Sequence, residues 1–278
     1  MRQLLLFHNV FPFKRTLKDI LFFPVEYHGR FGKANYPWAI NLLVTSKCNL
    51  NCEMCNFNHF SKMCSSEEEL SFDDIKDFVE REYKNKPHIF LSGGEPFVRE
   101  DIFEIISIIK RKGLTCGICT NGILLDEVKI KELIKLKVEY MIFSLLGPKE
   151  VHDATTGASG AFDKLCDNIR LLSLSNDGMK IILSCAVTKS NLNYLLRTTE
   201  IAEKLNVDVL RFEHLNFLTN LEIEEHRRLF KKDFPEDGMF LSSYFAGPQT
   251  YDNAFYDSII NMESLKSSFK IPIYFNHI

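Results

Sequence analysis

The sequence lacks any run of 18 or more apolar residues, so it predicts no transmembrane helix. The apolar N-terminal segment 1–13 also lacks the small-residue cleavage site of a signal peptide. The formal net charge is only −3, which provides no electrostatic basis for nucleic-acid binding. These absences favour a cytoplasmic protein that binds no nucleic acid. Segment 1–23 mixes Phe, Leu and Lys, which leaves a weak contact with a membrane surface open.

Cysteine is unevenly distributed along the chain. Three of the eight cysteines lie within residues 48–55, and none follows Cys185. A secreted disulfide scaffold spreads its cysteines more evenly, so the pattern argues against that class and favours a reducing compartment. With 278 residues and 45% hydrophobic content, the chain can bury the core of one large α/β or barrel domain.

Apolar strand-like runs alternate with amphipathic helical runs. Such alternation predicts an α/β fold with a parallel sheet covered by helices, and six units predict a partial (β/α)6 TIM-like barrel. In such folds the chemistry lies at the carboxyl ends of the strands. The expected strands are 39–44, which we interpret as buried, then 88–91, 115–119, 140–145, 180–187, 209–214 and a final short 271–275. The expected helices begin with a capping box at Ser71 and Asp74 and continue with 101–112, 129–136, 161–172, 192–205, 221–231 and 251–270.

This alternation also suggests how the chain is divided. We expect an N-terminal extension over residues 1–36, a core domain over 37–232, and a C-terminal tail over 233–278 that packs on the core. The stretch 234–248 contains two prolines and two glycines and is interpreted as a loop.

A cysteine triplet, Cys48-x-x-x-Cys52-x-x-Cys55, directly follows the first expected strand. A closed zinc site takes four protein ligands, and Cys64 or His59 could supply the fourth. Alternatively, the three thiolates hold three corners of a four-iron cluster, which usually has four cysteine ligands. The fourth iron would then be open to a small molecule. The spacing of the cysteines alone allows both readings.

A glycine-rich turn, Gly93-Gly94-Glu95-Pro96, follows the second expected strand. Two glycines allow the backbone to approach a ligand closely, and the exposed backbone groups with Glu95 behind them can accept an ammonium group. Taken alone, the turn fits an ordinary strand-to-helix connection equally well.

Two further polar turns end the next strands. Thr120 and Asn121 precede a glycine at the end of the third expected strand, and Ser144 ends the fourth. Asn-Gly is common in turns, so either segment alone says little about function. All four motifs nevertheless fall at carboxyl ends of strands, where ligands bind in such folds.

In order and spacing, these motifs resemble those of the radical SAM family. The resemblance implies that Cys48, Cys52 and Cys55 hold a [4Fe–4S] cluster whose open iron binds the methionine end of S-adenosylmethionine (SAM). It implies reductive cleavage of SAM to a 5′-deoxyadenosyl radical, which abstracts hydrogen from a peptide or small-molecule substrate. The electron would come from a donor such as a flavodoxin or ferredoxin. The implied SAM contacts are Gly93, Gly94, Glu95, Pro96, Thr120, Asn121 and Ser144.

The sequence departs from the family pattern at three positions. Met54 stands where the family usually has an aromatic residue, Leu146 where it usually has Asp, and Thr156 where it usually has Arg. The last two support an alternative, a non-catalytic iron–sulfur or zinc-binding protein on the same scaffold. The chain looks most similar to the SPASM/twitch-type branch but lacks its cysteine-rich C-terminal extension. We expect either a short form or a truncated chain.

Two further groups of residues have open interpretations. On the sixth expected strand, alternating polar residues fit either a cavity lining or solvent-facing positions; they are Arg211, Glu213, His214 and Asn216. Cys116 and Cys119 lie three apart within one strand and should face opposite sides of it, a poor geometry for a shared metal. We interpret them as buried thiols.

Overall fold

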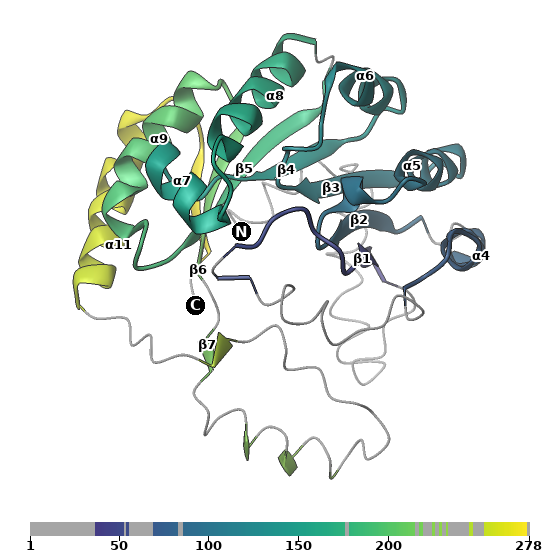
Figure 1. The fold of residues 1–278 in the computed structure, drawn as a ribbon, viewed down its shortest axis with the longest axis horizontal. Coiled ribbons are helices and arrows are strands. Elements are labelled where there is room, and N and C mark those ends of the chain that lie inside the picture. Colours follow the sequence, from purple (N-terminus) through teal and green to yellow (C-terminus); the bar gives the residue numbers. More distant parts are fainter. Residues whose placement is uncertain are drawn as a thin grey trace, which may run out of the picture.

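The computed structural model describes residues 37–52, 54–55, 69–82, 86–175, 178–214, 217–218, 224–225, 228–229, 232, 245–246 and 253–276. Among these residues, one sheet contains seven parallel strands in the order β1-β2-β3-β4-β5-β6-β9, and most of the helices form an arc around its outside (Figure 1). The strands are β1 Ala39–Thr45, β2 His88–Gly93, β3 Thr115–Thr120, β4 Tyr140–Ser144, β5 Lys180–Val187, β6 Val209–His214 and β9 Ile273–Asn276.

The helices connect successive strands, as the alternation predicts. The described α-helices are α4 Phe72–Glu82, α5 Ile102–Arg111, α6 Glu127–Lys135, α7 Lys149–Thr156, α8 Ala161–Ser175, α9 Leu195–Lys204 and α11 Asn253–Leu265. A second, two-stranded parallel sheet pairs β7 Phe217–Leu218 with β8 Phe245–Ala246. This architecture confirms the predicted α/β class and partial barrel.

The final strand extends the sheet beyond the six predicted units. β9 pairs in parallel with β6, with Leu210 opposite Ile273 and Phe212 opposite Phe275. The rings of Phe212 and Phe275 stack at 5.1 Å between centroids. The C-terminal part of the chain therefore contributes a seventh strand to the main sheet.

The start of α4 has the predicted capping box. The backbone N–H and the hydroxyl of Ser71 both donate to Asp74 Oδ2, at 2.9 and 2.6 Å, and the backbone N–H of Asp74 donates to Ser71 Oγ at 3.1 Å. This reciprocal pairing satisfies N–H groups that have no partner inside the helix. It fixes where α4 begins.

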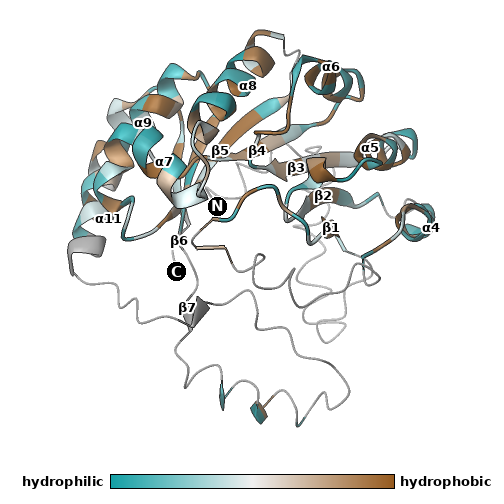
Figure 2. Ribbon diagram, in the orientation of Figure 1, coloured by the Kyte–Doolittle hydropathy of each residue, from teal (hydrophilic) through white to brown (hydrophobic). Residues whose placement is uncertain are grey.

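The core lies between the outer face of the sheet and the helices. On α5, Ile102, Ile105, Ile106 and Ile109 are all buried, as the helical period of 3.6 residues requires. On β5, buried and half-buried residues alternate strictly along the strand. Figure 2 shows apolar residues along the strands and on the helix sides that face them.

Three expectations need correction or further comment. β1 is not buried on both faces: it is an edge strand, and the side chain of Leu43 is 49% exposed. Helix α7 was not predicted, because the residues that it buries include His152, Thr155 and Thr156 and form no apolar stripe. Of the expected helix 221–231, most residues lie outside the described part of the chain. No described helix combines the length and apolarity needed to span a membrane.

Candidate functional site

The four sequence motifs come together at the carboxyl edge of β1 to β4. The cysteine triplet follows β1, the glycine-rich turn follows β2, and Thr120 and Ser144 are the last residues of β3 and β4. Side by side, the parallel strands bring their ends to one edge. The site is thus formed by segments that are distant in the sequence.

The three thiols of the triplet are half-buried. The sulfur of Cys48 accepts hydrogen bonds from the backbone N–H of Leu50 at 3.4 Å and from Asn121 Nδ2 at 3.9 Å. The backbone N–H of Cys55 donates to the carbonyl of Cys52 at 3.0 Å, which forms a tight turn. Hydrogen-bond donors directed at sulfur are the environment that tunes iron–sulfur ligands.

Burial raises the pKa of Cys48, and repulsion from Glu95 and Cys55 adds to the shift. Burial, together with the neighbouring Cys55 and Cys48, raises the pKa of Cys52 to about 12. Without a bound cation these thiols are protonated at neutral pH, whereas metal ligation requires thiolates. Iron would supply the positive charge that removes the protons.

Within the described residues, no three His, Cys, Asp or Glu side chains lie close enough together to hold a single metal ion. A zinc ion needs its ligands around one point, about 2.3 Å from each sulfur. A four-iron cluster instead binds each thiolate at a different iron. The three neighbouring, partly accessible thiols could each bind a different iron of such a cluster. His59 and Cys64, the suggested fourth zinc ligands, lie outside the described residues.

The glycine-rich turn packs directly against the residues that precede Cys48. The backbone N–H of Gly94 donates to the carbonyl of Thr45, and that of Glu95 to the carbonyl of Lys47, both at 2.8 Å. A Cβ atom on Gly93 would lie 2.3 Å from the carbonyl oxygen of Thr45, and one on Gly94 would lie 2.1 Å from that of Lys47. Only glycine permits this approach. The two glycines therefore join the turn to the cysteine-bearing segment.

Glu95 is fully buried and links the second and third motifs. Its Oε1 accepts hydrogen bonds from Thr120 Oγ1 at 2.7 Å and from the backbone N–H of Phe97 at 3.1 Å. Its Oε2 accepts one from the backbone N–H of Asn121 at 2.7 Å. Burial raises the pKa of Glu95, while these three donors favour the ionised form and oppose that rise. The carboxylate thus orders two turns from inside.

Asn121 completes the connection to the cysteines. Besides its contact with Cys48, its Nδ2 donates to Asn49 Oδ1 at 2.8 Å, and its Oδ1 accepts from the backbone N–H of Ile123 at 3.0 Å. Ser144 at the end of β4 hydrogen-bonds the half-buried Cys119, whose pKa burial raises to about 12. The structure thereby places the predicted cluster ligands and the predicted SAM contacts at one edge of the sheet.

The loop after β4 and the helix α7 that follows it contain two of the three departures from the family pattern. Leu146 is buried, and its backbone N–H donates to His152 Nδ1 at 3.1 Å. Its carbonyl accepts from Asn191 Nδ2 at 3.0 Å. Thr156 is also buried and donates its hydroxyl proton to the carbonyl of His152 at 2.8 Å. Leu146 packs in the loop and Thr156 at the end of α7, and neither presents charge to a ligand.

At the opposite edge of the sheet, where the strands begin, polar and aromatic side chains close its inner face, the face turned away from the helices. His88 Nδ1 lies 2.8 Å from Thr115 Oγ1, and its Nε2 lies 2.7 Å from the hydroxyl of Tyr140. The rings of His88 and Tyr140 stack at 5.3 Å. A Cβ on Gly117 would lie 2.1 Å from Cζ of Tyr140, so glycine makes room for this ring. The amino end of the inner face is therefore filled by side chains, and the motifs lie at the carboxyl end.

The polar residues of β6 face the same inner side. Leu210 and Phe212 are buried in the core, so the alternation turns Arg211 and Glu213 the other way, where they form an ion pair. Arg211 Nε is buried and makes no hydrogen bond within the described structure. The side chain of His214 and all of Asn216 lie outside the described residues. Cys116 is fully buried and Cys119 is not, as opposite faces of a strand require.

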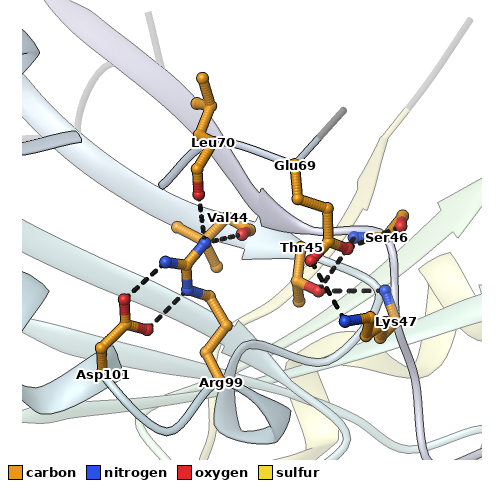
Figure 3. A network of polar contacts seen from close by, with 8 residues as sticks. All are labelled: Val44, Thr45, Ser46, Lys47, Glu69, Leu70, Arg99 and Asp101. Carbon is orange, nitrogen blue, oxygen red and sulfur yellow. Dashed lines mark hydrogen bonds and ion pairs between the residues drawn. The ribbon is translucent and has the colours of Figure 1, made fainter. Parts of the chain in front are cut away.

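A polar network beside the triplet was not predicted from the sequence. Figure 3 shows Glu69 bonded to Thr45 and Ser46, and Arg99 bonded to Asp101 and to the carbonyls of Val44 and Leu70. Its partners lie up to 55 residues apart in the chain. Such pairings depend on the register of β1 and β2, and no local pattern reveals them.

Comparison with known protein families decides the assignment. The radical SAM superfamily profile matches residues 42–183, about half of the chain, which include all four motifs. The chain belongs to the radical SAM superfamily. The cofactors of this superfamily are a [4Fe–4S] cluster and SAM, as the sequence resemblance implied.

Two curated relatives come from Methanosarcina barkeri strain Fusaro. One, Fe-coproporphyrin III synthase, is 26% identical over 232 residues, covering 75% of this chain and 56% of the relative. The other, AdoMet-dependent heme synthase, is 34% identical over 173 residues, covering 62% of this chain and 48% of the relative. The chain thus spans about half the length of these relatives.

The fold is also similar to a solved radical SAM structure. Streptococcus suis SuiB bound to S-adenosylmethionine superposes with a TM-score of 0.64, covering 95% of this chain and 55% of SuiB. At 13% sequence identity, this similarity supports the fold alone.

Proposed function

We propose that this chain is a radical SAM enzyme that abstracts hydrogen from a peptide or small-molecule substrate. Cys48, Cys52 and Cys55 would hold the [4Fe–4S] cluster. The main supporting observation is the hydrogen-bonded connection that runs from the thiol of Cys48 through Asn121 to the buried Glu95. This connection joins the segment for the cluster to the turns for SAM. When bound, the reduced cluster and SAM supply a 5′-deoxyadenosyl radical.

The residues of the three turns would bind and orient SAM. The proposed contacts are Gly93, Gly94, Glu95, Pro96, Thr120, Asn121 and Ser144. Glu95 would act by holding the turn backbone in place, because its carboxylate oxygens already accept three hydrogen bonds from the protein. Backbone groups of the turn, rather than that carboxylate, would then meet the methionine end. The rigid carboxyl edge would orient the reacting groups and exclude water.

The substrate would enter on the inner face, where Arg211 and Glu213 lie. Two relatives are named for the synthesis of Fe-coproporphyrin III and heme, which makes an iron tetrapyrrole the first small molecule to test. Electrons would come from a donor such as a flavodoxin or ferredoxin.

We also propose that the chain is divided into an N-terminal extension, 1–36, a core domain, 37–232, and a C-terminal tail, 233–278. The pairing of β9 with β6 supports the packing of that tail on the core.

The test is anaerobic reconstitution with iron and sulfide, followed by reduction with dithionite in the presence of SAM. Chromatography then measures 5′-deoxyadenosine. We expect it from the wild-type chain and not from Cys48→Ala, Cys52→Ala or Cys55→Ala. Cys166→Ala is the matched control, because Cys166 is a buried thiol on α8, outside the triplet.

Two outcomes would contradict the proposal. If zinc binds and iron and sulfide do not, the chain is a zinc-binding protein on this scaffold. If the cluster assembles but SAM is never cleaved, the non-catalytic alternative replaces the enzyme.

A further inference from the structure

All three cysteines lie on one segment of the chain, residues 45–69, whose two ends meet beside the site. Thr45 and Ser46 begin the segment and Val44 directly precedes it; Glu69 ends it and Leu70 directly follows (Figure 3). Side chains from two different places connect these ends. They are Glu69 itself and Arg99, which directly follows the short helix Pro96–Val98 of the glycine-rich turn.

Glu69 binds the first end of the segment with a single carboxylate oxygen. Its Oε1 accepts from Ser46 Oγ at 2.7 Å, from the backbone N–H of Ser46 at 2.8 Å and from Thr45 Oγ1 at 2.9 Å. Its Oε2 lies 3.7 Å from Lys47 Nζ. Burial opposes ionisation of Glu69, but these partners outweigh it, and the pKa of the carboxyl is lowered. Glu69 is therefore a carboxylate at neutral pH.

Arg99 holds both ends at once. Its Nη1 donates to the carbonyl of Val44 at 2.7 Å and to that of Leu70 at 2.8 Å. Its Nε and Nη2 form a bidentate pair with Asp101 at 2.7 and 2.6 Å. Only 11% of the Arg99 side chain is exposed, so the fork is largely shielded from water. Bidentate, charge-assisted bonds of this kind fix orientation as well as distance.

We propose that Glu69, Arg99 and Asp101, here called the clasp, are positioning residues for the iron–sulfur cluster. The clasp closes the cysteine-bearing segment and joins it to the glycine-rich turn. It thereby sets the place of the three thiols relative to the proposed SAM site. This inference rests on the proposed function, because it assigns the cluster to Cys48, Cys52 and Cys55.

The physical basis is the entropy of an open segment. Bringing together the ends of 25 residues costs conformational entropy, and interactions at the base of the segment must offset it. Thr45 and Ser46 donate hydrogen bonds to Glu69 of the clasp, while the carbonyls of Thr45 and Lys47 accept bonds from the glycine-rich turn. Without the clasp, we expect the turn to keep only the first end in place. The thiols would then lose the preorganised spacing that a cluster requires.

The test uses conservative variants of the full chain. Arg99→Lys keeps the charge but loses the planar fork, and Glu69→Gln keeps the size but loses the charge. The matched controls are Arg170→Lys and Glu127→Gln, whose side chains form exposed ion pairs on α8 and α6. Iron and sulfide content, the rate of iron loss to an added chelator, and the electron paramagnetic resonance spectrum with and without SAM are measured anaerobically.

We expect both clasp variants to lose iron roughly tenfold faster than wild type, as outer-sphere substitutions at metal sites do. We also expect the change that SAM produces in the resonance spectrum to shrink or disappear. Both controls should match wild type. Clasp variants that retain iron and respond to SAM like the controls would overturn the proposal.

Hydrogen exchange on the cluster-free chain separates this inference from the proposed function. The amides of residues 44–47 should exchange faster in the clasp variants, while those of α5 stay protected and show that the chain is folded. If the wild type assembles no cluster, the proposed function fails. The positioning role for the cluster fails with it, and the exchange rates of residues 44–47 then show whether the clasp still orders the cysteine-bearing segment. If these rates are the same in wild type and clasp variants, the clasp does not order the segment, and the inference is overturned whether or not a cluster assembles.

Discussion

At the amino ends of β2, β3 and β4, the inner face is closed by a histidine, a threonine and a tyrosine, whereas at the carboxyl ends buried acidic and basic side chains order the turns. His88, Thr115 and Tyr140 satisfy one another through hydrogen bonds and ring stacking. At the other end, the carboxyl group of Glu95 and the guanidinium of Arg99 hydrogen-bond the backbone and side chains of neighbouring turns. The amino end of the sheet needs only to be filled by packed side chains. The carboxyl end must also hold irregular turns in fixed positions.

The comparison shows why carboxylates and a guanidinium are needed at the carboxyl edge. Turns leave N–H and C=O groups without partners in a strand or helix, and burying such groups unbonded costs free energy. A charged side chain accepts or donates several bonds at once, so one residue satisfies several turn groups. Variants at the two ends should therefore fail in different ways, and the predictions below run from the largest effect to the smallest.

The strongest effect is expected at Glu95. Glu95→Ala leaves the donors of Thr120, Asn121 and Phe97 without their acceptor, which should lower the free energy of unfolding by about 4 kcal/mol. Urea unfolding of the cluster-free chain measures this. Glu127→Ala, at an exposed ion pair on α6, should cost less than about 0.5 kcal/mol. Similar costs at both positions would contradict the role assigned to Glu95.

His152 gives the carboxyl end a pH dependence. Burial lowers its pKa to about 4, so the folded state binds this proton less readily than the unfolded state, whose histidine pKa is about 6.5. The contribution of neutral His152 to the free energy of unfolding is complete above pH 6.5, and it is lost as the pH falls toward 4. Wild type should lose about 3 kcal/mol more than His152→Gln between pH 7 and pH 4.

The measurement for His152 is urea unfolding of both cluster-free chains across this pH range. Only the difference between the two curves reports His152, because the carboxyl groups titrate in both chains. Parallel curves for the two proteins would show that His152 is solvated in the folded state.

Two glycines provide a direct comparison of the ends. A Cβ on Gly94 would meet the carbonyl of Lys47, and one on Gly117 would meet the ring of Tyr140. Each substitution by alanine should lower the free energy of unfolding by about 2 kcal/mol through overpacking. Only Gly94→Ala should also reduce iron incorporation, because only that residue packs on the cysteine-bearing segment. Equal iron content in both variants would remove the distinction between the ends.

The smallest effect is expected from Tyr140→Phe. This change removes the hydroxyl that bonds His88 Nε2 and should cost about 1 kcal/mol. SAM cleavage by the reconstituted protein should stay at the wild-type level. A large loss of cleavage with little loss of stability would mean that the amino end takes part in the chemistry.

The regular elements could be predicted from the sequence because their patterns are local. The isoleucines of α5 repeat with the helical period, and β5 alternates between buried and half-buried positions. Helix α7 escaped prediction because His152, Thr155 and Thr156 are buried through packing and hydrogen bonds and not as an apolar stripe. The exposed face of β1 was missed because edge and central strands have similar local sequences.

The sequence by itself determined the order of strands and helices, the cysteine spacing, and the placement of each motif after a strand. The tertiary structure alone decided that the carboxylate of Glu95 is turned inward and that Glu69 and Arg99 join the ends of the cysteine-bearing segment. The reason is physical: periodicity is encoded within a few neighbouring residues. The hydrogen-bond partners of a buried acidic or basic side chain depend instead on strand register, here Thr45 beside Gly93, and on groups up to 55 residues away, such as the carbonyl of Val44 for Arg99.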